Sequence, residues 1–301
     1  MNIPAFLKKN SFVLGLLLIF VLAEIGLMFW NPMETSRRFA KDDFTKTLYH
    51  HNWSRTGAVF YGNSAVTGAY MEDKSSVKLV EMGMSLGKLT DLKEILQREL
   101  YNVQGELVIG IDVHTMLDKM DTDYRFPWHK PWYKPYVYAY RADFLDTGTE
   151  FVRNLALKGS LDYQPRWIDK ELYYGRESSE QLVKDWARYN EKYNWMTLAD
   201  MKDNVEALQW VITYSKQRNL PLRVVWMPFI QGHEKPPYTE AMKQEVNSRL
   251  QASDVPVLDL MDRYEPGLFH DLVHLNREEG APVFTKEVDA WLLSLRKPQK
   301  S

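Results

Sequence analysis

Two short motifs, far apart in the chain, carry residue types that could do covalent chemistry together. Gly62-Asn63-Ser64 closes an apolar run near the start of the chain, and Asp271-Leu272-Val273-His274-Leu275-Asn276 lies near its end. A serine hydroxyl becomes a nucleophile when a histidine takes its proton and a carboxylate orients that histidine. Ser64, His274 and Asp271 are therefore candidates for a catalytic triad.

Each motif taken alone also has an ordinary structural explanation. A serine that follows a strand is often a helix N-cap, and small polar residues are common at turns. An Asp-x-x-His pair such as Asp271 and His274 is frequent by chance, and a lone histidine is more often structural than catalytic. The motifs predict catalysis only if the fold brings them together.

Short apolar runs alternate with helical patterns along most of the chain. Strands are expected at 58–61, 77–82, 107–111, 222–227 and 255–260, and helices at 89–100, at 199–217 and up to about residue 295. The helix at 199–217 places Met201, Val205, Leu208, Ile212 and Ser215 on one face. This alternation predicts an α/β fold, a flavodoxin-like three-layer sandwich with a central parallel sheet.

Active sites in such sheets lie beyond the carboxyl ends of the strands. Ser64 follows the first expected strand, Asp112 and His114 follow the third, and Asp271 and His274 come after the last. All five residues are therefore expected at the same edge of the sheet.

The segment from Phe12 to Trp30 is apolar apart from small residues and Glu24. Its length is about that needed to cross a bilayer as a helix. Lys8 and Lys9 precede it and place the N-terminus in the cytoplasm, because basic residues stay on that side. Residues 1–10 are thus predicted to be cytoplasmic and residues 11–30 to form a transmembrane anchor. Glu24 is expected either to snorkel to the outer interface or to meet a partner helix.

A cleaved signal peptide and a buried core helix are the alternatives for this segment. The run is longer than a usual signal-peptide core and lacks a small-x-small cleavage site, and a core helix would show a polar face. The rest of the chain is therefore expected outside the membrane, which in bacteria means the periplasm or the outer wall.

Four further regions complete the predicted organisation. Residues 31–55 are expected to be a linker, 56–296 one extracytoplasmic domain, and 297–301 a tail. Residues 120–198 are rich in tyrosine and tryptophan and are predicted to be an insertion beside the active-site edge. That insertion is either a small satellite core, a platform for sugar rings, or a surface against a membrane partner.

Composition excludes several classes of function. The chain of 301 residues has a net charge of −2 and no cysteine, which argues against nucleic-acid binding and rules out disulfides and cysteine zinc sites. His114, His129 and His233 show no His-x-x-x-His spacing, so no metal site is expected.

The two motifs together resemble those of the SGNH hydrolase superfamily, also called GDSL-type esterases. The resemblance implies that Ser64 is the nucleophile, His274 the general base and Asp271 its orienting carboxylate. It also implies that the backbone N–H of Ser64 donates to the oxyanion. Asn276 and Gly280 fit the run that usually follows the family's histidine.

The family's second and third blocks are matched less closely. The stretch from Glu81 to Gly87 resembles Asn-Leu-Gly-x-Ser-Gly-Gly, which implies Gly87 as an oxyanion donor, although Leu86 stands where a glycine is common. Asp112-Val113-His114-Thr115 stands where simple esterases carry Gly-x-Asn-Asp, whose asparagine is an oxyanion donor. His114 is expected either to replace that donor or to have a structural or substrate-orienting role.

The anchor and the altered third block resemble one subset of the superfamily, the extracytoplasmic proteins that work beside membrane-bound O-acyltransferases. Examples are the teichoic acid D-alanylation protein and the alginate acetylation proteins. The resemblance implies a single-pass protein of the inner (cytoplasmic) membrane that acylates a cell-envelope or exopolysaccharide glycan. O-Acetylation through acyl-Ser64 is the first expectation, with no cofactor. A carbohydrate esterase with the same triad, or a non-catalytic scaffold that binds a glycan or a partner, are the alternatives.

Overall fold

The computed structural model describes residues 10–32, 42–123, 125–129, 134–159 and 169–296. These residues belong to two compact units. The first unit takes in residues 1–41 and 129–169, and the second takes in residues 42–128 and 170–301. The candidate site lies entirely in the second unit.

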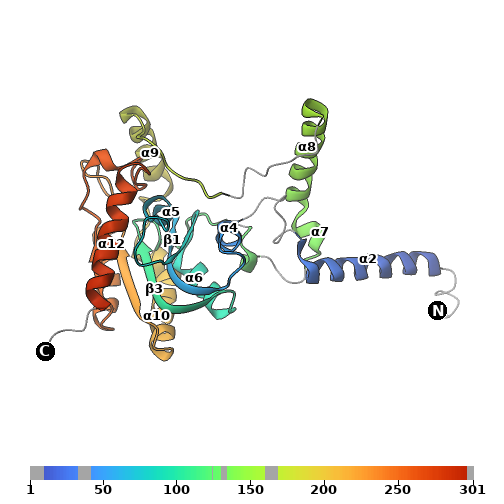
Figure 1. Ribbon diagram of the computed structural model, residues 1–301, viewed down its shortest axis with the longest axis horizontal. Coiled ribbons are helices and arrows are strands. Elements are labelled where there is room, and N and C mark those ends of the chain that lie inside the picture. Colours follow the sequence, from blue (N-terminus) through green and yellow to red (C-terminus); the bar gives the residue numbers. More distant parts are fainter. Residues whose placement is uncertain (1–9, 33–41, 124, 130–133, 160–168, 297–301) are drawn as a thin grey trace. The chain divides into compact units, whose positions relative to one another are not determined.

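The second unit is built on a parallel sheet, of which β1 and β3 are labelled in Figure 1. Its five strands lie in the order β2-β1-β3-β4-β5. The strands are β1 (Thr56–Asn63), β2 (Val80–Met84), β3 (Asn102–Ile111), β4 (Leu222–Trp226) and β5 (Val257–Asp259). This strand order is the flavodoxin-like one. The predicted α/β sandwich with a central parallel sheet is therefore confirmed.

Helices follow the strands in alternation and cover the two faces of the sheet. They are α5 (Ser64–Ala69), α6 (Leu89–Gln97), α9 (Ser179–Lys192), α10 (Lys202–Gln217), α11 (Thr239–Gln251) and α12 (Gly280–Arg296). Helix α10 contacts α6 and α11, and α5 contacts α12. Right-handed crossovers between parallel strands produce this arrangement, with α5 and α12 on one face and α6, α10 and α11 on the opposite face.

Most predicted elements differ from the observed ones by a few residues. The strand expected at 77–82 is β2, and the helix expected at 89–100 ends at Gln97. The helix expected at 199–217 begins with a 3-10 turn (Leu198–Met201) before α10. The residues predicted to share its apolar face are all buried, as expected for a helix packed on a sheet: Met201, Val205, Leu208, Ile212 and Ser215.

The prediction of a linker over residues 31–55 is wrong for its second half. Helix α4 (Asp43–His50) belongs to the second unit, and the Asp42 carboxylate accepts the backbone N–H of Thr45 at 2.9 Å to cap it. Phe44 and Leu48, one helical turn apart, are buried in the main core. A helix of eight residues with two core side chains is too short to show a helical period in the sequence. Residues 33–41 lie outside the described part of the chain.

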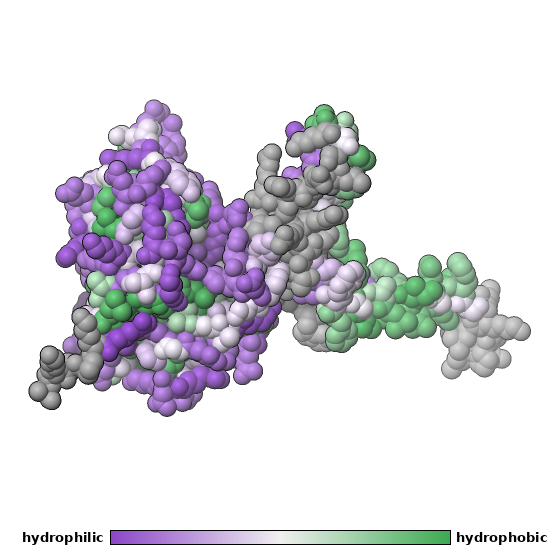
Figure 2. Space-filling model, in the orientation of Figure 1, coloured by the Kyte–Doolittle hydropathy of each residue, from purple (hydrophilic) through white to green (hydrophobic). Residues whose placement is uncertain are grey.

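The first unit contains α2 (Ser11–Trp30), α7 (Tyr136–Ala139) and α8 (Arg141–Lys158). Helix α2 has a mean hydropathy of 2.7 and is long and apolar enough to cross a membrane. Its surface is almost continuously hydrophobic (Figure 2). The Glu24 carboxylate accepts the backbone N–H of Val137 at 3.3 Å, so Glu24 meets a helix of its own chain.

The residues predicted to form one insertion, 120–198, are divided between the two units. Trp128 packs in the core of the second unit, whereas Tyr136 and Tyr140 pack against Leu27 in the first. An aromatic side chain stabilises any apolar core in which it is buried. The high aromatic content of residues 120–198 therefore did not show which of the two cores each residue joins. Tyr124, Trp132, Tyr133 and Trp167 lie outside the described residues.

Candidate active site

Ser64 is the first residue of α5 and directly follows β1. The Asn63 side chain accepts the backbone N–H of Ala65 at 2.9 Å, so Asn63 and not Ser64 caps the helix. Glycine is required beneath this turn, because a Cβ on Gly62 would lie 2.3 Å from a methyl carbon of Val66. Because the Asn63 side chain caps α5, the Ser64 hydroxyl is not used as a helix cap.

The structure brings the three predicted triad residues into one hydrogen-bonded chain. His274 Nε2 lies 2.9 Å from Ser64 Oγ, and His274 Nδ1 lies 2.6 Å from Asp271 Oδ2. The other carboxylate oxygen of Asp271 accepts the backbone N–H groups of Val273 at 2.9 Å and His274 at 2.8 Å. Asp271 therefore fixes both the loop and the imidazole that the loop carries.

The environment favours an ionised Asp271 and a basic His274. Burial raises the pKa of Asp271, but the charge of His274 and hydrogen bonds from its ring and from backbone N–H groups lower it to about 2. Burial lowers the pKa of His274, but the charge and hydrogen bond of Asp271 outweigh this and raise it above 6.5. A histidine with a raised pKa beside a fixed carboxylate is suited to proton transfer.

Asn276 and Gly280, which follow the histidine in the motif, hold the loop in place. The side-chain oxygen Oδ1 of Asn276 accepts the backbone N–H groups of Glu279 at 2.8 Å and Gly280 at 3.1 Å, at the start of α12. Its amide donates to the carbonyl of Gly267 at 2.9 Å. A Cβ on Gly280 would lie 2.1 Å from the carbonyl oxygen of Leu268, so only glycine fits there.

Asp112 and His114 lie at the end of β3, at the same edge as Ser64. One Asp112 oxygen accepts the backbone N–H groups of His114 at 2.9 Å and Thr115 at 2.7 Å, and the Thr115 hydroxyl at 2.7 Å. Burial raises the pKa of Asp112, but His114 and hydrogen bonds from Asn63 and Thr115 lower it far below its usual value. Asp112 is therefore a buried carboxylate that shapes the turn.

The ring of His114 is almost fully buried beside Asp112. Its Nδ1 lies 3.8 Å from Asp112 Oδ2, and the rings of Tyr189 and Tyr193 pack against it at centroid distances of 4.9 and 5.1 Å. Its Nε2 has no hydrogen-bond partner within the described part of the chain. His114 thus has one buried ring nitrogen without a partner among the described residues, and it lines the same pocket as Ser64.

The second block forms a turn after β2. Leu86 has a φ of 58°, in the left-handed region that favours glycine. The Gly87 N–H donates to the carbonyl of Met84 at 2.8 Å, so this predicted oxyanion donor already has a partner. Leu86, not Gly87, lines the candidate pocket.

A pocket of about 260 Å³ opens beside the triad. Ser64 and His274 line it together with Asp112 and His114. Helix α9 supplies another part of its wall through Arg188, Tyr189 and Lys192, followed by Tyr193. The sequence did not single out these α9 residues as site residues, and the aromatic richness of their region was the only signal of their contribution.

No protein-family model and no curated protein sequence matches the chain. Among solved structures it is similar to the acetyl xylan esterase AlAXEase, with 12% identity, a TM-score of 0.32, and coverage of 80% of this chain and 100% of the esterase. It is also similar to the GH99 endo-alpha-mannosidase from Bacteriodes thetaiotaomicron, with 12% identity, a TM-score of 0.15, and coverage of 80% and 97%. Similarity at this level does not define an activity, so the function rests on the site itself.

Proposed function

We propose that this protein is a serine-dependent acyl-transfer enzyme that acts outside the cytoplasm. The observation that carries the proposal is the continuous hydrogen-bonded chain from Ser64 through His274 to Asp271, placed at the carboxyl edge of a parallel sheet. The adjoining pocket of about 260 Å³ has room for a small acyl group and part of an acceptor. This combination supports covalent catalysis through acyl-Ser64.

In the first step the Ser64 Oγ bonds to the carbonyl carbon of an acyl donor while its proton moves to His274 Nε2. Asp271 stabilises the resulting imidazolium. As the tetrahedral intermediate collapses, the bond to the leaving group breaks, and the leaving group takes the proton from His274. The product of this step is an ester on Ser64.

The oxyanion of that intermediate requires hydrogen-bond donors. We assign this role to the backbone N–H of Ser64, with His114 Nε2 as a second donor because it has no hydrogen-bond partner among the residues that the structure describes. Gly87 is the weakest of the three predicted donors, since its N–H would have to leave the Met84 carbonyl.

In the second step an acceptor hydroxyl gives its proton to His274 and attacks the acyl carbon. We propose a glycan hydroxyl as this acceptor, because Tyr189 and Tyr193 supply the aromatic surface on which sugar rings pack. The reaction is then O-acylation, with O-acetylation as its simplest form. Water as the acceptor would make the same site a carbohydrate esterase.

The proposed location is the cytoplasmic membrane, with the second unit outside it. The length and hydropathy of α2 and the preceding Lys8 and Lys9 support this orientation. Activated acyl donors are made in the cytoplasm, so an enzyme outside needs a protein that delivers acyl groups across the bilayer. We propose a membrane-bound O-acyltransferase as that partner and a cell-envelope glycan or exopolysaccharide as the acceptor.

The proposal is tested by trapping the acyl-enzyme. Full-length protein in detergent is treated with p-nitrophenyl acetate, and mass spectrometry locates the acetyl group. We expect it on Ser64, abolished in Ser64→Ala and retained in Ser248→Ala, which changes an exposed serine. Acetylation that persists in Ser64→Ala would show that the assignment of the nucleophile is wrong.

A non-catalytic scaffold is the competing function. Complementation of a deletion strain with Ser64→Ala or His274→Ala distinguishes the scaffold from the enzyme. We expect both strains to lose the ester groups of the envelope polymer, measured by alkaline release. Full acylation in either strain would favour the scaffold.

A further inference from the structure

A segment that we call the strap, Lys170–Glu177, packs over the triad. Tyr173 of the strap stacks on the imidazole of His274, with ring centroids 3.8 Å apart and an angle of 13° between the planes. The Tyr173 ring also lies against α5, where a Cβ on Gly68 would be 3.0 Å from Tyr173 Cδ2. Gly68 thus leaves the space that this stacking needs.

The stacking supplies a constraint that the hydrogen bonds of the triad lack. The bonds to Ser64 and Asp271 are made at Nε2 and Nδ1, in the plane of the imidazole. They leave the ring free to rock about the line that joins its two partners. A flat contact on one face of the ring opposes that rotation and also keeps water from that face.

Tyr173 remains a neutral phenol while it is stacked on His274. Burial raises its pKa, the carboxylates of Glu171 and Asp271 raise it further, and an interaction with Ser64 opposes the rise in part. The Tyr173 side chain therefore reaches both the base and the nucleophile without competing with His274 for protons at neutral pH.

Hydrogen bonds tie the strap to the loop that carries His274. They join Tyr173 O to Arg277 N at 2.8 Å, Tyr174 O to His270 Nδ1 at 2.9 Å, Gly175 N to Glu278 Oε2 at 3.0 Å, and Glu177 N to His270 O at 2.8 Å. The strap and the catalytic loop therefore form one hydrogen-bonded layer.

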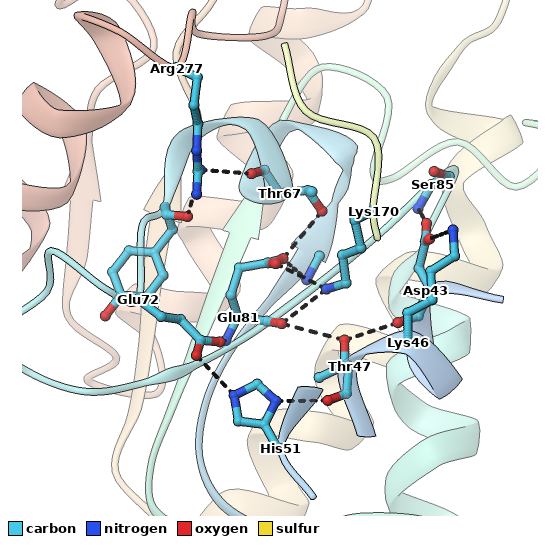
Figure 3. Close-up of polar contacts among 12 residues, drawn as sticks. Asp43, Lys46, Thr47, His51, Thr67, Glu72, Glu81, Ser85, Lys170 and Arg277 are labelled. Carbon is cyan, nitrogen blue, oxygen red and sulfur yellow. Dashed lines mark hydrogen bonds and ion pairs between the residues drawn. The ribbon is translucent and has the colours of Figure 1, made fainter. Parts of the chain in front are cut away.

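An ion pair fixes the start of the strap to the sheet. Lys170 Nζ lies 3.0 Å from both the carbonyl oxygen and Oε2 of Glu81, the second residue of β2 (Figure 3). The other carboxylate oxygen of Glu81 accepts the hydroxyl of Thr67 on α5 at 3.2 Å. Only 9% of the Lys170 side chain is exposed, so removal of one partner leaves a nearly buried charge unpaired.

We propose that Tyr173 is a positioning residue for His274 and that it favours transfer to a glycan hydroxyl over hydrolysis of the acyl-enzyme. The inference rests on the proposed function. In either reaction the acceptor O–H gives its proton to His274 Nε2, the acceptor oxygen bonds to the acyl carbon, and the bond from that carbon to Ser64 Oγ breaks. Oγ then takes the proton from His274. Because water and a glycan hydroxyl use the same base, access of water to His274 decides between them.

The test measures how the acyl-enzyme partitions between two acceptors. Full-length protein in detergent is acylated with p-nitrophenyl acetate in the presence of methyl α-glucopyranoside, and free acetate and acetylated glucoside are both quantified. We expect Tyr173→Ala to form acyl-Ser64 about 10- to 100-fold more slowly, because the base is less well placed. We also expect its ratio of hydrolysis to transfer to rise about tenfold.

Two variants separate positioning from a general loss of structure. Tyr173→Phe keeps the stacked ring and should retain the wild-type partition ratio and pH profile. Lys170→Met removes the ion pair with Glu81 and leaves the stacked ring in place, so it should change the ratio in the same direction as Tyr173→Ala, by a smaller factor. A Tyr173→Ala variant with the wild-type rate, ratio and pH profile would overturn the inference.

Failure of the proposed function gives a different result. In that case the wild-type protein itself forms no acyl-Ser64, whatever residue stands at position 173. If the wild type is acylated and Tyr173→Ala has the wild-type rate, ratio and pH profile, only the role of Tyr173 is wrong.

Discussion

His274 Nε2 lies 2.9 Å from Ser64 Oγ, although 210 positions separate the two residues in the chain. Ser64 reaches this point at the end of β1, and His274 reaches it on the loop that precedes α12. The two segments meet because parallel strands direct all their carboxyl ends to one edge of the sheet.

The triad residues should be essential for acylation and dispensable for folding. Ser64→Ala and His274→Ala are expected to lower kcat for an activated ester by about 10⁴-fold or more, because members of a triad act as a unit. The burst of p-nitrophenol measures this loss, and thermal unfolding serves as the control. A variant with a normal burst would contradict the assignment of its residue.

The pH dependence should follow His274, which must be neutral to take a proton. Its pKa is raised above 6.5 by Asp271, against the opposing effect of burial, so the rate should rise with pH through that raised pKa. Asp271→Asn removes the anion and should move this limb of the kcat/KM profile to lower pH while the maximum falls. A limb that stays in place would show that another group titrates there.

Asp271 and His274 should each make the folding stability depend on pH, one at the acidic end and the other at the alkaline end. The stabilisation that His274 gains is complete below 6.5 and is lost as pH rises through its raised pKa in the folded protein. The stabilisation that Asp271 gains is present above 3.8 and is lost as pH falls through about 2. Denaturant unfolding of wild type and Asp271→Asn over this pH range measures both contributions.

His114 should contribute to the rate through its free Nε2. His114→Ala is expected to lower kcat about 10²- to 10³-fold, the usual cost of losing an oxyanion donor. His114→Asn supplies a side-chain amide N–H as a hydrogen-bond donor in place of the imidazole, and it should recover part of the rate. Equal, small effects of the two substitutions on kcat would assign His114 a structural role.

Gly62 should tolerate a side chain only if Val66 gives way. Gly62→Ala places a Cβ 2.3 Å from Val66 Cγ2 and is expected to destabilise the fold by about 1–3 kcal/mol through overpacking. Val66→Ala removes that methyl group, so the double variant should be more stable than the sum of the two single effects predicts. Simple additivity in urea unfolding would contradict the close approach.

The membrane orientation can be read from single cysteines, because the chain has none of its own. Ser248→Cys on α11 should react with a membrane-impermeant maleimide in intact spheroplasts. Asn2→Cys should react only after lysis. The reverse pattern would place the triad in the cytoplasm and exclude an extracytoplasmic acyl transfer.

The sequence by itself determined the framework and the residue types of the site. The continuous apolar run at 107–111 indicated a strand buried on both faces, and β3 contains it. The long apolar stretch before Asn31, in which Glu24 is the one charged residue, indicated a helix long enough to cross a membrane, and α2 covers it. These features are local, since the period and length of an apolar run depend on neighbouring residues alone.

The tertiary structure decided which distant residues meet. It joined Ser64 to His274, placed α4 in the core where a linker was expected, and divided residues 120–198 between two units. It also placed Tyr173 on the imidazole of His274, a contact that no spacing in the sequence predicts. Such contacts depend on which segments share one edge of the sheet, and that is settled only when the strands and helices pack.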